Sequence, residues 1–530
     1  MLKLKTDIEN YSPNYNATIC RVGEMEPIAD SEHLSKTVIN GFTMVISNDI
    51  HKGDIVAYFP LECALSEKFL SANNLYSLSE YERNANASEV HRLIRASVNE
   101  GEQGNDEEAK TLMAKAKARV GFFDKKGRVR IIKLRGVYSE GFIAGVSALE
   151  VYEPRLKGTD WNSLVGTSFN FVFDDNICWK YIPLELLKPE QSDGQSKSKK
   201  HQRKVEKLDR LVPGTYEVHY DTQMLNGNMD RFSPDDVITI TVKVHGALGE
   251  FCRLPVKRML TTWEKIKRFF GCKVAESEYG NIYSSHHVIK NRYLNPNASV
   301  GFYNFDLWGE VNKRIYPYLD EGVTVYGEIV GYLPGSETMV QKNHDYGCKV
   351  GQWKFMPYRM TRLNPDGSRY EYNVSEVLDA TNMLIQNKPE TEAWLMPITM
   401  LYHGKFGELY PDIDVNAADW REQVLERMKN DKEHFLMEEL EPMCHLYETE
   451  ANNAKKLLDD AIANNTSKKE IKVLEKKYND IMSRRAPREG IVIRKDNDII
   501  PEAFKLKTAR HYEQARKQHD DGEVDIEEIS

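Results

Sequence analysis

The chain has 530 residues, which at ~150 residues per domain corresponds to roughly three or four domain-sized units and excludes a single small binding module. Hydrophobic residues make up 41% of the chain and charged residues 29%, so it can bury substantial cores and is not a disordered polymer. The formal net charge of −9 argues against a broadly basic, histone-like protein, although enzymes that act on nucleic acids often confine positive charge to a groove.

The cysteines and the N-terminus indicate the compartment. The seven cysteines are scattered and form no C-x-x-C pair, which favours neither a zinc site nor a disulfide framework. Asp7 and Glu9 stand where a signal peptide would need an apolar core, and no later run approaches the ~20 apolar residues of a membrane span. We expect a cytoplasmic protein, in the host cytoplasm if a phage encodes it, with no membrane partner.

The first 150 residues predict one domain. Short β-rich runs alternate with turn signals over 17–65, which is typical of a small β-barrel. A charged helical stretch at 89–119 interrupts them before strands resume. The segment 151–214 then connects to the rest of the chain, and the polar, lysine-rich run 187–207 predicts a mobile linker, more simply a solvated loop than a phosphate contact.

From residue 215 onwards the pattern is β-rich and later helical. We predict one domain over 215–510, with an inserted helical hairpin at 446–485 whose two helices are joined at NNTS. Strand character returns at GIVIRKDND and AFKLKT, and residues 511–530 form a charged tail with an acidic end. The predicted fold class is therefore α+β.

Four short motifs, each weak alone, occur in a fixed order. K-x-x-G is expected about twice by chance in this composition and does occur twice, at Lys133 and Lys243. The ordered set is Lys243-Val244-His245-Gly246, Tyr326-Gly327-Glu328, Glu489-Gly490-Ile491-Val492-Ile493-Arg494 and Lys505-Leu506-Lys507.

Together these motifs describe a nucleotide site. A lysine amine can attack an α-phosphate to form a phosphoramidate, provided that burial and nearby cations suppress its protonation. Lys505 and Lys507 can supply those cations, because alternation along a strand places both on one face while Leu506 packs the other way. The simpler alternative for K-x-K is an exposed strand face.

Two strand acids beside glycine complete the set, Glu328 after Gly327 and Glu489 before Gly490. Glycine lets a ligand approach the backbone closely, so one acid can accept ribose hydroxyl hydrogen bonds and the other can hold a divalent cation. The simpler alternative is a pair of solvent-facing acids.

The order of these motifs resembles the covalent nucleotidyltransferase superfamily of ATP-dependent ligases and mRNA-capping guanylyltransferases, and most closely the RNA ligases of the Deinococcus type and their phage relatives. KVHG has His245 where DNA ligases and capping enzymes usually show Asp, and REGIVIRK and AFKLKT resemble the late family motifs. The resemblance implies an N-terminal OB-like β-barrel followed by an ATP-grasp-like nucleotidyltransferase domain of antiparallel sheets with helices and a helical insertion.

Spacing within that resemblance favours Lys243 over Lys133 as the nucleophile. Only 85 residues separate Lys243 from Glu328, whereas 195 separate Lys133 from it. The 23 residues after Lys507 are too few for the C-terminal OB domain that DNA ligases and capping enzymes generally append.

The resemblance also implies roles for the remaining residues. Glu328 binds the ribose, Glu489 holds Mg²⁺ or Mn²⁺, and Lys505 and Lys507 contact the phosphates of ATP. His245 and Gly246 of the nucleophile motif are expected to lie against the nucleotide. An aromatic ring from FMPYRM, either Phe355 or Tyr358, stacks on adenine.

The chain departs from the family at two positions. YSSHHVIKN shows His286 where relatives have an arginine at the phosphates, so either His286 or Lys290 takes that role or the role is lost. Val242 precedes the nucleophile where related RNA ligases often have Glu.

The function implied is ATP-dependent RNA ligation in RNA repair. A lysyl-AMP intermediate and an adenylylated 5′ end would lead to sealing of 3′-OH and 5′-phosphate RNA ends, in a nicked duplex or a broken tRNA. The alternatives are a DNA ligase or mRNA-capping guanylyltransferase, and, from another class, a non-catalytic nucleic-acid-binding protein with a ligase fold.

Overall fold

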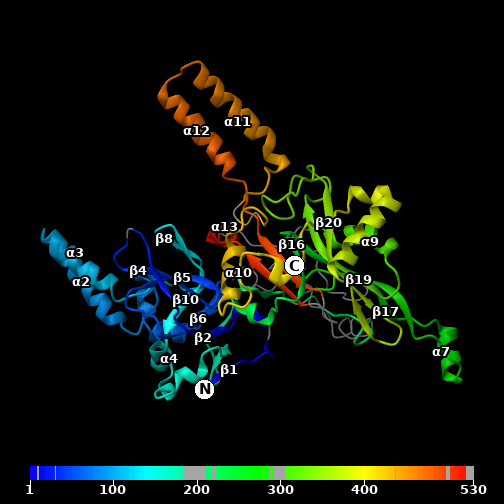
Figure 1. Cartoon of the computed structure of the whole chain (residues 1–530), viewed down its shortest axis with the longest axis horizontal. Helices are drawn as coiled ribbons and strands as arrows, with labels where there is room; N and C mark the ends of the chain where they lie inside the picture. Colours follow the sequence, from blue (N-terminus) through cyan, green and yellow to red (C-terminus); the bar gives the residue numbers. More distant parts are fainter. Residues whose placement is uncertain are drawn as a thin grey trace. The chain divides into compact units, whose positions relative to one another are not determined.

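The computed structural model describes residues 1–8, 11–29, 31–182, 210–217, 219, 221–286, 288–291, 305–435, 437, 439–496 and 502–520. The chain divides into two compact units, Met1–Pro183 with Asn226–Met229 and Leu184–Leu225 with Asp230–Ser530. Both contain helices and sheets whose strand pairs are antiparallel except for β15 with β24, in agreement with the predicted α+β class (Figure 1). The predicted linker 187–207 and the last ten residues of the predicted tail lie outside the described residues.

The first unit consists of small antiparallel sheets and short helices. Its largest sheet has the order β10-β6-β2-β11, and β3-β4-β5 form another. Along β5 every second residue is buried, which is the pattern of a strand with one face on the core. The strands are β1 (Leu2–Lys3), β2 (Ala17–Arg21), β3 (Met25–Pro27), β4 (Leu34–Ile39), β5 (Phe42–Ser47), β6 (Ile55–Phe59), β7 (Cys63–Leu65), β8 (Ile132–Leu134), β9 (Val137–Ser139), β10 (Phe142–Gly145), β11 (Ser168–Phe169), β12 (Phe171–Val172), β13 (Asp175–Asn176) and β14 (Cys178–Lys180).

Two helices fill the helical stretch that we predicted at 89–119. They are α2 (Ala87–Glu102) and α3 (Asp106–Lys117), and Val90 and Leu93 of α2 form a small core with Ala116 of α3. The shorter helices are α1 (Glu67–Ala72) and α4 (Val146–Tyr152). Among the described strands of this unit the sheets are separate and no closed barrel is assigned, so the OB-like barrel stays a prediction.

The second unit contains two five-stranded sheets. The β16 sheet has the order β15-β24-β23-β16-β22, and the β17 sheet has the order β18-β17-β19-β20-β21. The strands are β15 (Gln223–Met224), β16 (Val237–Lys243), β17 (Ala247–Lys257), β18 (Ser277–Ser284), β19 (Val323–Gly331), β20 (Trp353–Leu363), β21 (Arg369–Glu371), β22 (Met400–Lys405), β23 (Gly490–Lys495) and β24 (Glu502–Lys507).

Helices cover and extend these sheets. A continuous core joins β17, β19 and β20 to α8 through Phe251, Trp308, Ile329 and Phe355. The helices are α7 (Thr262–Phe269), α8 (Leu307–Ile315), α9 (Val374–Asn387), α10 (Trp420–Lys429), α11 (His445–Ala463), α12 (Lys468–Met482) and α13 (Ala509–Asp520). No helix of the described chain is long and apolar enough to cross a membrane.

The hairpin predicted at 446–485 consists of α11 and α12, which run antiparallel and are shown in orange in Figure 1. It has its own small core, in which Ala451, Ala454 and Ile481 are buried. Its two ends meet at a neck, where the Glu441 amide donates to the Ala486 carbonyl at 2.7 Å and the Arg488 amide to the Glu439 carbonyl at 3.1 Å. The chain therefore leaves and re-enters the unit at one point, directly before Glu489.

Candidate active site

Three strand ends meet at Gly490. In the β16 sheet, Gly490 of β23 lies opposite Lys243, the last residue of β16, and opposite Lys507, the last residue of β24. Gly490 has φ +151°, and a Cβ there would lie 2.0 Å from the Leu506 carbonyl oxygen. Only glycine fits this close approach, which brings both lysines to Glu489, the residue before it.

Glu489 is the centre of the site. Its carboxylate is buried, and its Oε1 atom lies 2.9 Å from Lys243 Nζ and 2.7 Å from Lys507 Nζ. Burial by itself would raise the pKa of Glu489, but the charges of Lys243 and Lys507 hold that pKa well below its usual value. The carboxylate is therefore ionised, and it is shared by two ammonium groups.

Three buried histidines surround this carboxylate. His245 Nδ1 lies 3.6 Å from Oε2 and His511 Nε2 lies 3.7 Å from Oε1. The ring of His245 also contacts the rings of His344 and His511 edge-on, at centroid distances of 4.8 and 5.1 Å. Burial lowers the pKa of His344 to about 4 and that of His511 well below its usual value, so both are neutral at pH 7.

Sequence reasoning missed His344 and His511. His511 comes from α13, where we had predicted only the beginning of a charged tail, and His344 comes from the turn after β19. Neither lies in a motif, so only the folded chain brings them to Glu489.

The donor set fits a divalent cation. One ligand atom each from His245, Glu489 and His511 lie within 4.8 Å of one another. Carboxylate oxygens suit Mg²⁺ and Mn²⁺, while imidazole nitrogens suit later transition metals better than Mg²⁺. The predicted metal role of Glu489 is thus compatible with its neighbours, and it stays a prediction.

Glu328 of β19 and Gly246, in the turn between β16 and β17, lie close to each other. Glu328 of β19 is buried and lies opposite Leu248 of β17. A Cβ on Gly246 would come 2.7 Å from the Ile329 carbonyl oxygen and 3.1 Å from Glu328 Oε2, so the site has no room for a larger residue at 246. The Gly246 carbonyl accepts a hydrogen bond from Gln341 Nε2 at 3.0 Å, which fixes this turn.

The two aromatic candidates have different environments. Phe355 is 1% exposed and packs edge-on against Phe251 at 5.2 Å, inside the core of the β17 sheet. Tyr358 is half-buried, and its hydroxyl lies 3.4 Å from His219 Nε2. Because Phe355 is enclosed by core side chains, Tyr358 is the candidate that we retain for stacking on adenine.

Lys505 lies on the face that the sequence predicted. Along β24, Phe504 and Leu506 are fully buried while Lys505 and Lys507 are both half-buried, so the two lysines share one face. The pKa of His219 lies well below its usual value. Burial is the main cause, the charge of Arg359 comes next, and the charge of Lys505 also lowers it. Lys505 therefore lies towards His219 and Tyr358, and Lys507 towards Glu489.

The two replacements considered for the missing arginine have separate partners. Lys290 Nζ lies 4.8 Å from the centre of the Trp308 ring, and His286 Nε2 lies 4.0 Å from Asp221 Oδ1. The choice between them stays a prediction. Lys133, the other K-x-x-G lysine, lies 4.4 Å above the Tyr138 ring on an exposed hairpin of the first unit.

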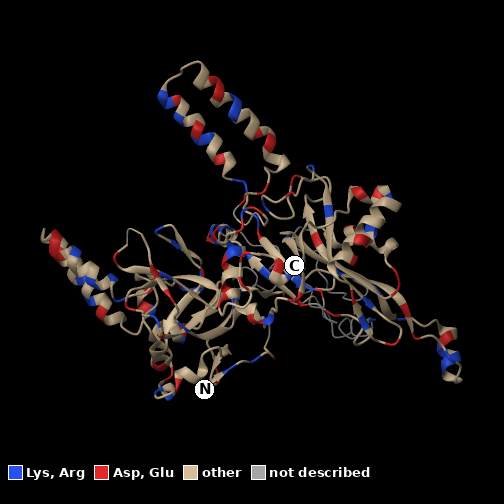
Figure 2. Cartoon of the chain, in the orientation of Figure 1, with Lys and Arg blue, Asp and Glu red and all other residues tan. Residues whose placement is uncertain are grey.

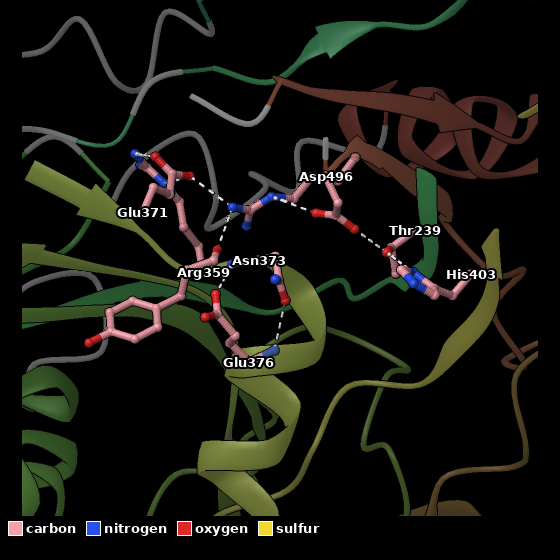
Figure 3. A network of polar contacts seen from close by, with 9 residues as sticks. Thr239, Arg359, Glu371, Asn373, Glu376, His403 and Asp496 are labelled. Carbon is pink, nitrogen blue, oxygen red and sulfur yellow. Dashed lines mark hydrogen bonds and ion pairs between the residues drawn. The ribbon is translucent and has the colours of Figure 1, made fainter. Parts of the chain in front are cut away.

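A network of buried charges joins the two sheets beside the site. Arg359 of β20 makes a two-pronged contact with Glu371 of β21, at 2.9 and 3.0 Å. Arg494 of β23 reaches the same Glu371 at 3.3 Å, and its Nε lies 3.6 Å from Asp496 (Figure 3). Arg494, from the motif that begins at Glu489, thus links the β16 sheet to the β17 sheet.

Figure 3 shows how the network continues to β16 and α9. Asp496 accepts a hydrogen bond from the Thr239 hydroxyl, which lies 2.8 Å from His403 Nδ1. Asn373 and Glu376 close a capping box at the start of α9. These polar contacts fix β16, the strand that ends at the predicted nucleophile.

Comparison with known proteins gives structural matches only. No family model matches the chain, and no curated protein does. Among solved structures, the chain is similar to a lysine-to-alanine variant of the Naegleria gruberi RNA ligase with ATP and Mn, at 13% identity and a TM-score of 0.47, over 95% of this chain and 99% of that one. A glutamate-to-alanine variant of that ligase with AMP and Mn has 14% identity and a TM-score of 0.46, over 94% and 98%. At such values, residue roles in this chain have to be argued from its own contacts.

Proposed function

We propose that the chain is an ATP-dependent RNA ligase that uses Lys243 as its nucleophile. The observation that carries this proposal is the contact of Lys243 and Lys507 with one carboxylate oxygen of Glu489. Lys243 is half-buried, and a second cation beside a partly buried lysine is an arrangement that promotes nucleophilic attack by its amine. The motif resemblance points to the same lysine on independent grounds.

In the first step, Lys243 Nζ attacks the α-phosphate of ATP. A nitrogen–phosphorus bond forms, the bond to the pyrophosphate oxygen breaks, and the amine loses its proton, leaving lysyl-AMP and pyrophosphate. Glu489 holds Lys243 Nζ in place at 2.9 Å, and Lys507 Nζ lies 2.7 Å from the same oxygen, where its charge balances that of the carboxylate. Glu328 is proposed to bind the ribose, and Tyr358 to stack on adenine.

Glu489, with His245 and His511 beside it, is proposed to hold a divalent cation, Mg²⁺ or Mn²⁺. Such a cation stabilises negative charge that develops on phosphate oxygens. Lys505 and Lys507 then hold the phosphates while AMP is transferred to a 5′-phosphate and the 3′-OH of the neighbouring RNA end displaces AMP. Both lysines share one face of β24, which allows them to act on one phosphate group.

The test is transfer of label from α-labelled ATP to the denatured polypeptide, in the presence of Mg²⁺ or Mn²⁺. We expect the wild type and Lys133→Ala to become labelled and Lys243→Ala to remain unlabelled. Lys133 is the matched control because it stands in the other K-x-x-G sequence and contacts Tyr138 in the first unit. Glu489→Gln should reduce labelling by about a hundredfold, since it removes the charge that positions Lys243.

Three results would contradict the proposal. Label on Lys243→Ala would show a different nucleophile. Label from GTP instead of ATP would favour a capping enzyme. Absence of label in the wild type with either nucleotide would favour a binding protein with a ligase fold.

A further inference from the structure

Helix α7 exposes large aromatic side chains far beyond what a surface normally shows. It lies at the end of the β17–β18 hairpin, just after Lys257 pairs with Ser277. Trp263 is 72% exposed, Phe269 85% and Phe270 75%. Contiguous apolar surface of this kind marks an interaction site, because it costs solubility without contributing to a core.

None of the residues of α7 is buried, so packing against a core does not hold this helix. The contacts that stabilise it lie at its two ends. Thr261 and Glu264 form a capping box, and Arg258 donates to Glu264 Oε1 at 2.7 Å. The Cys272 amide donates to the Lys267 carbonyl at 2.9 Å and closes the other end. The contacts that define α7 thus leave its aromatic side chains uncovered.

The aromatic side chains form one face with lysines at its edges. Trp263, Ile266 and Phe270 recur at the spacing of one helix face, with Phe269 beside them. At 100° per residue, Lys265 and Lys267 fall on the two borders of this face. We call these six residues the α7 face.

The charge of this region contrasts with that of the chain. Residues 257–273 contain six basic residues and one acidic residue, whereas the chain carries −9. Figure 2 shows the Lys and Arg residues gathered on α7. Lys265 and Lys267 are exposed and form no ion pair with a described residue, while Arg258 and Arg268 are paired with Glu264 and Glu276. The surface therefore offers free positive charge beside flat apolar rings.

We propose that the α7 face binds unpaired nucleotides of an RNA strand. Bases stack on Trp263, Phe269 and Phe270, and phosphates contact Lys265 and Lys267, which is the combination that single-strand binding uses. An anionic, base-bearing polymer satisfies both properties of the face, since its charge complements the lysines and its bases cover the rings. The choice of RNA over DNA rests on the proposed function.

The path of β17 gives the distance from the nucleophile. This strand begins four residues after Lys243 and runs from Ala247 to Lys257, where α7 follows. At about 3.3 Å per residue, β17 spans roughly 33 Å. A strand of stacked nucleotides, which rises about 3.4 Å per nucleotide along its axis, needs roughly ten nucleotides to cover that length, and a more extended strand needs fewer. For an RNA whose 5′ end is held at Lys243, the α7 face should therefore contribute to binding only when the strand is long enough to reach it.

The test compares binding of 5′-phosphorylated, fluorescein-labelled single-stranded RNAs of about twenty and about five nucleotides to the full chain by fluorescence anisotropy. For the variant Trp263→Ala/Phe269→Ala/Phe270→Ala we expect Kd for the long RNA to rise at least about tenfold and Kd for the short RNA to stay unchanged. Lys265→Glu/Lys267→Glu should also weaken binding and reduce the salt dependence by about two phosphate contacts.

Matched controls come from the α11–α12 hairpin. Leu457→Ala/Val473→Ala removes exposed apolar side chains, and Lys476→Glu/Lys477→Glu reverses exposed charges, in both cases away from α7. Both should bind the long RNA as the wild type does. Self-labelling by ATP, which involves no RNA, should be unchanged in every α7 variant and so reports that the second unit is folded.

The proposal is overturned if the aromatic variant binds the long RNA within about twofold of the wild type, or if it loses short and long RNA equally. It is also overturned if the α7 variants lose binding to phosphatidylserine vesicles while RNA binding is intact, since α7 would then be a membrane contact. Failure of self-labelling in the wild type, with the RNA differences present, would refute the proposed ligase and leave the α7 face as an RNA site.

Discussion

At the scale of single residues, Glu489 and Glu250 are buried carboxyl groups of the second unit whose pKa values are shifted in opposite directions. Glu489 is surrounded by cations, and they lower its pKa despite its burial. Glu250 of β17 is equally buried, but its partners are hydroxyl groups, Tyr216 at 3.0 Å and Ser284 at 3.2 Å. Burial therefore prevails at Glu250 and raises its pKa to about 7.

Glu250 makes the stability of the second unit depend on pH. Its pKa is about 7 in the folded chain and near 4.5 when exposed, so the unfolded chain ionises first as pH rises. The stability that the protonated carboxyl contributes is complete below pH 4.5 and is lost as pH rises towards 7. The predicted loss is about 3 kcal/mol, from about 1.4 kcal/mol for each pKa unit.

Glu250→Gln removes this loss, because an amide does not ionise. We expect the stability of the variant relative to the wild type to improve by about 3 kcal/mol between pH 4.5 and pH 8, measured by urea unfolding at several pH values. Glu392→Gln, an exposed carboxyl in the same unit, serves as the control and should follow the wild type. Parallel profiles for Glu250→Gln and the wild type would refute the assignment.

At the scale of elements, the α11–α12 hairpin is the clearest separable part. Its core is its own, and its neck is closed by backbone hydrogen bonds between 439–441 and 486–488. The first turn of α11 is tied to the unit, since Asp345 accepts from the His445 amide at 2.7 Å. Within the part of the chain that the structure describes, the ion pairs of Glu489 come from Lys243, His245, Lys507 and His511, and none comes from the arms beyond that turn.

We therefore expect replacement of residues 449–483 by a short Gly-Ser linker to leave self-labelling by ATP within about threefold of the full chain, since the ends of the insertion are adjacent. The measurement is the labelling rate with α-labelled ATP. As a contrast, removing the neck as well, by replacing 439–488, should abolish labelling because Glu489 loses its backbone support. Loss of labelling in the shorter replacement would instead assign the arms a role in the first step.

The sequence predicted those parts of the structure that depend on local pattern. Alternation along β24 placed Lys505 and Lys507 on one face, and helix periodicity located the hairpin. The meeting of Lys243 and Lys507 at Glu489 follows from strand pairing, which periodicity cannot specify: β16 pairs with β23 across more than 200 residues, and β23 pairs with β24, which follows it. The chemistry of the motifs predicted that Lys505 and Lys507 supply cations near the nucleophile, but not that lysines meet at Glu489. His344 and His511 had no signal, because a histidine in a turn or a charged helix looks like surface until the chain is folded.

The aromatic candidates illustrate another limit. FMPYRM contains two rings three residues apart, and the sequence could not rank them. A register shift between Tyr326 and Gly327, opposite Pro357 and Arg359, interrupts the alternation of β20. Phe355, on one side of this bulge, packs into the core, while Tyr358 is the residue inside the bulge. Such a bulge has no reliable sequence signature.

At the scale of the whole molecule, the seven cysteines are distributed over both units, so their reactivity shows whether either unit opens. All are free thiols, and only Cys272, two residues beyond Phe270, is exposed. Burial raises the pKa of Cys20 and Cys178 to about 12 and that of Cys348 to about 11, which suppresses their thiolates as well as their access to solvent.

We therefore expect one thiol to react rapidly with Ellman's reagent in the native chain and all seven in denaturing guanidinium chloride. Peptide mapping after alkylation should assign the rapid thiol to Cys272, and Cys272→Ser should abolish the rapid phase. Rapid reaction of a second thiol would show that one of the two units opens readily under native conditions.

The contact of Glu371 with both Arg359 and Arg494 has an evolutionary consequence. Loss of one partner of a buried ion pair leaves an uncompensated charge and typically costs about 3–5 kcal/mol, whereas replacing the whole group by apolar residues is often tolerated. Substitutions at positions 359, 371 and 494 are therefore not independent, and a lineage can change them only together. Among related chains, these three positions should vary as a set.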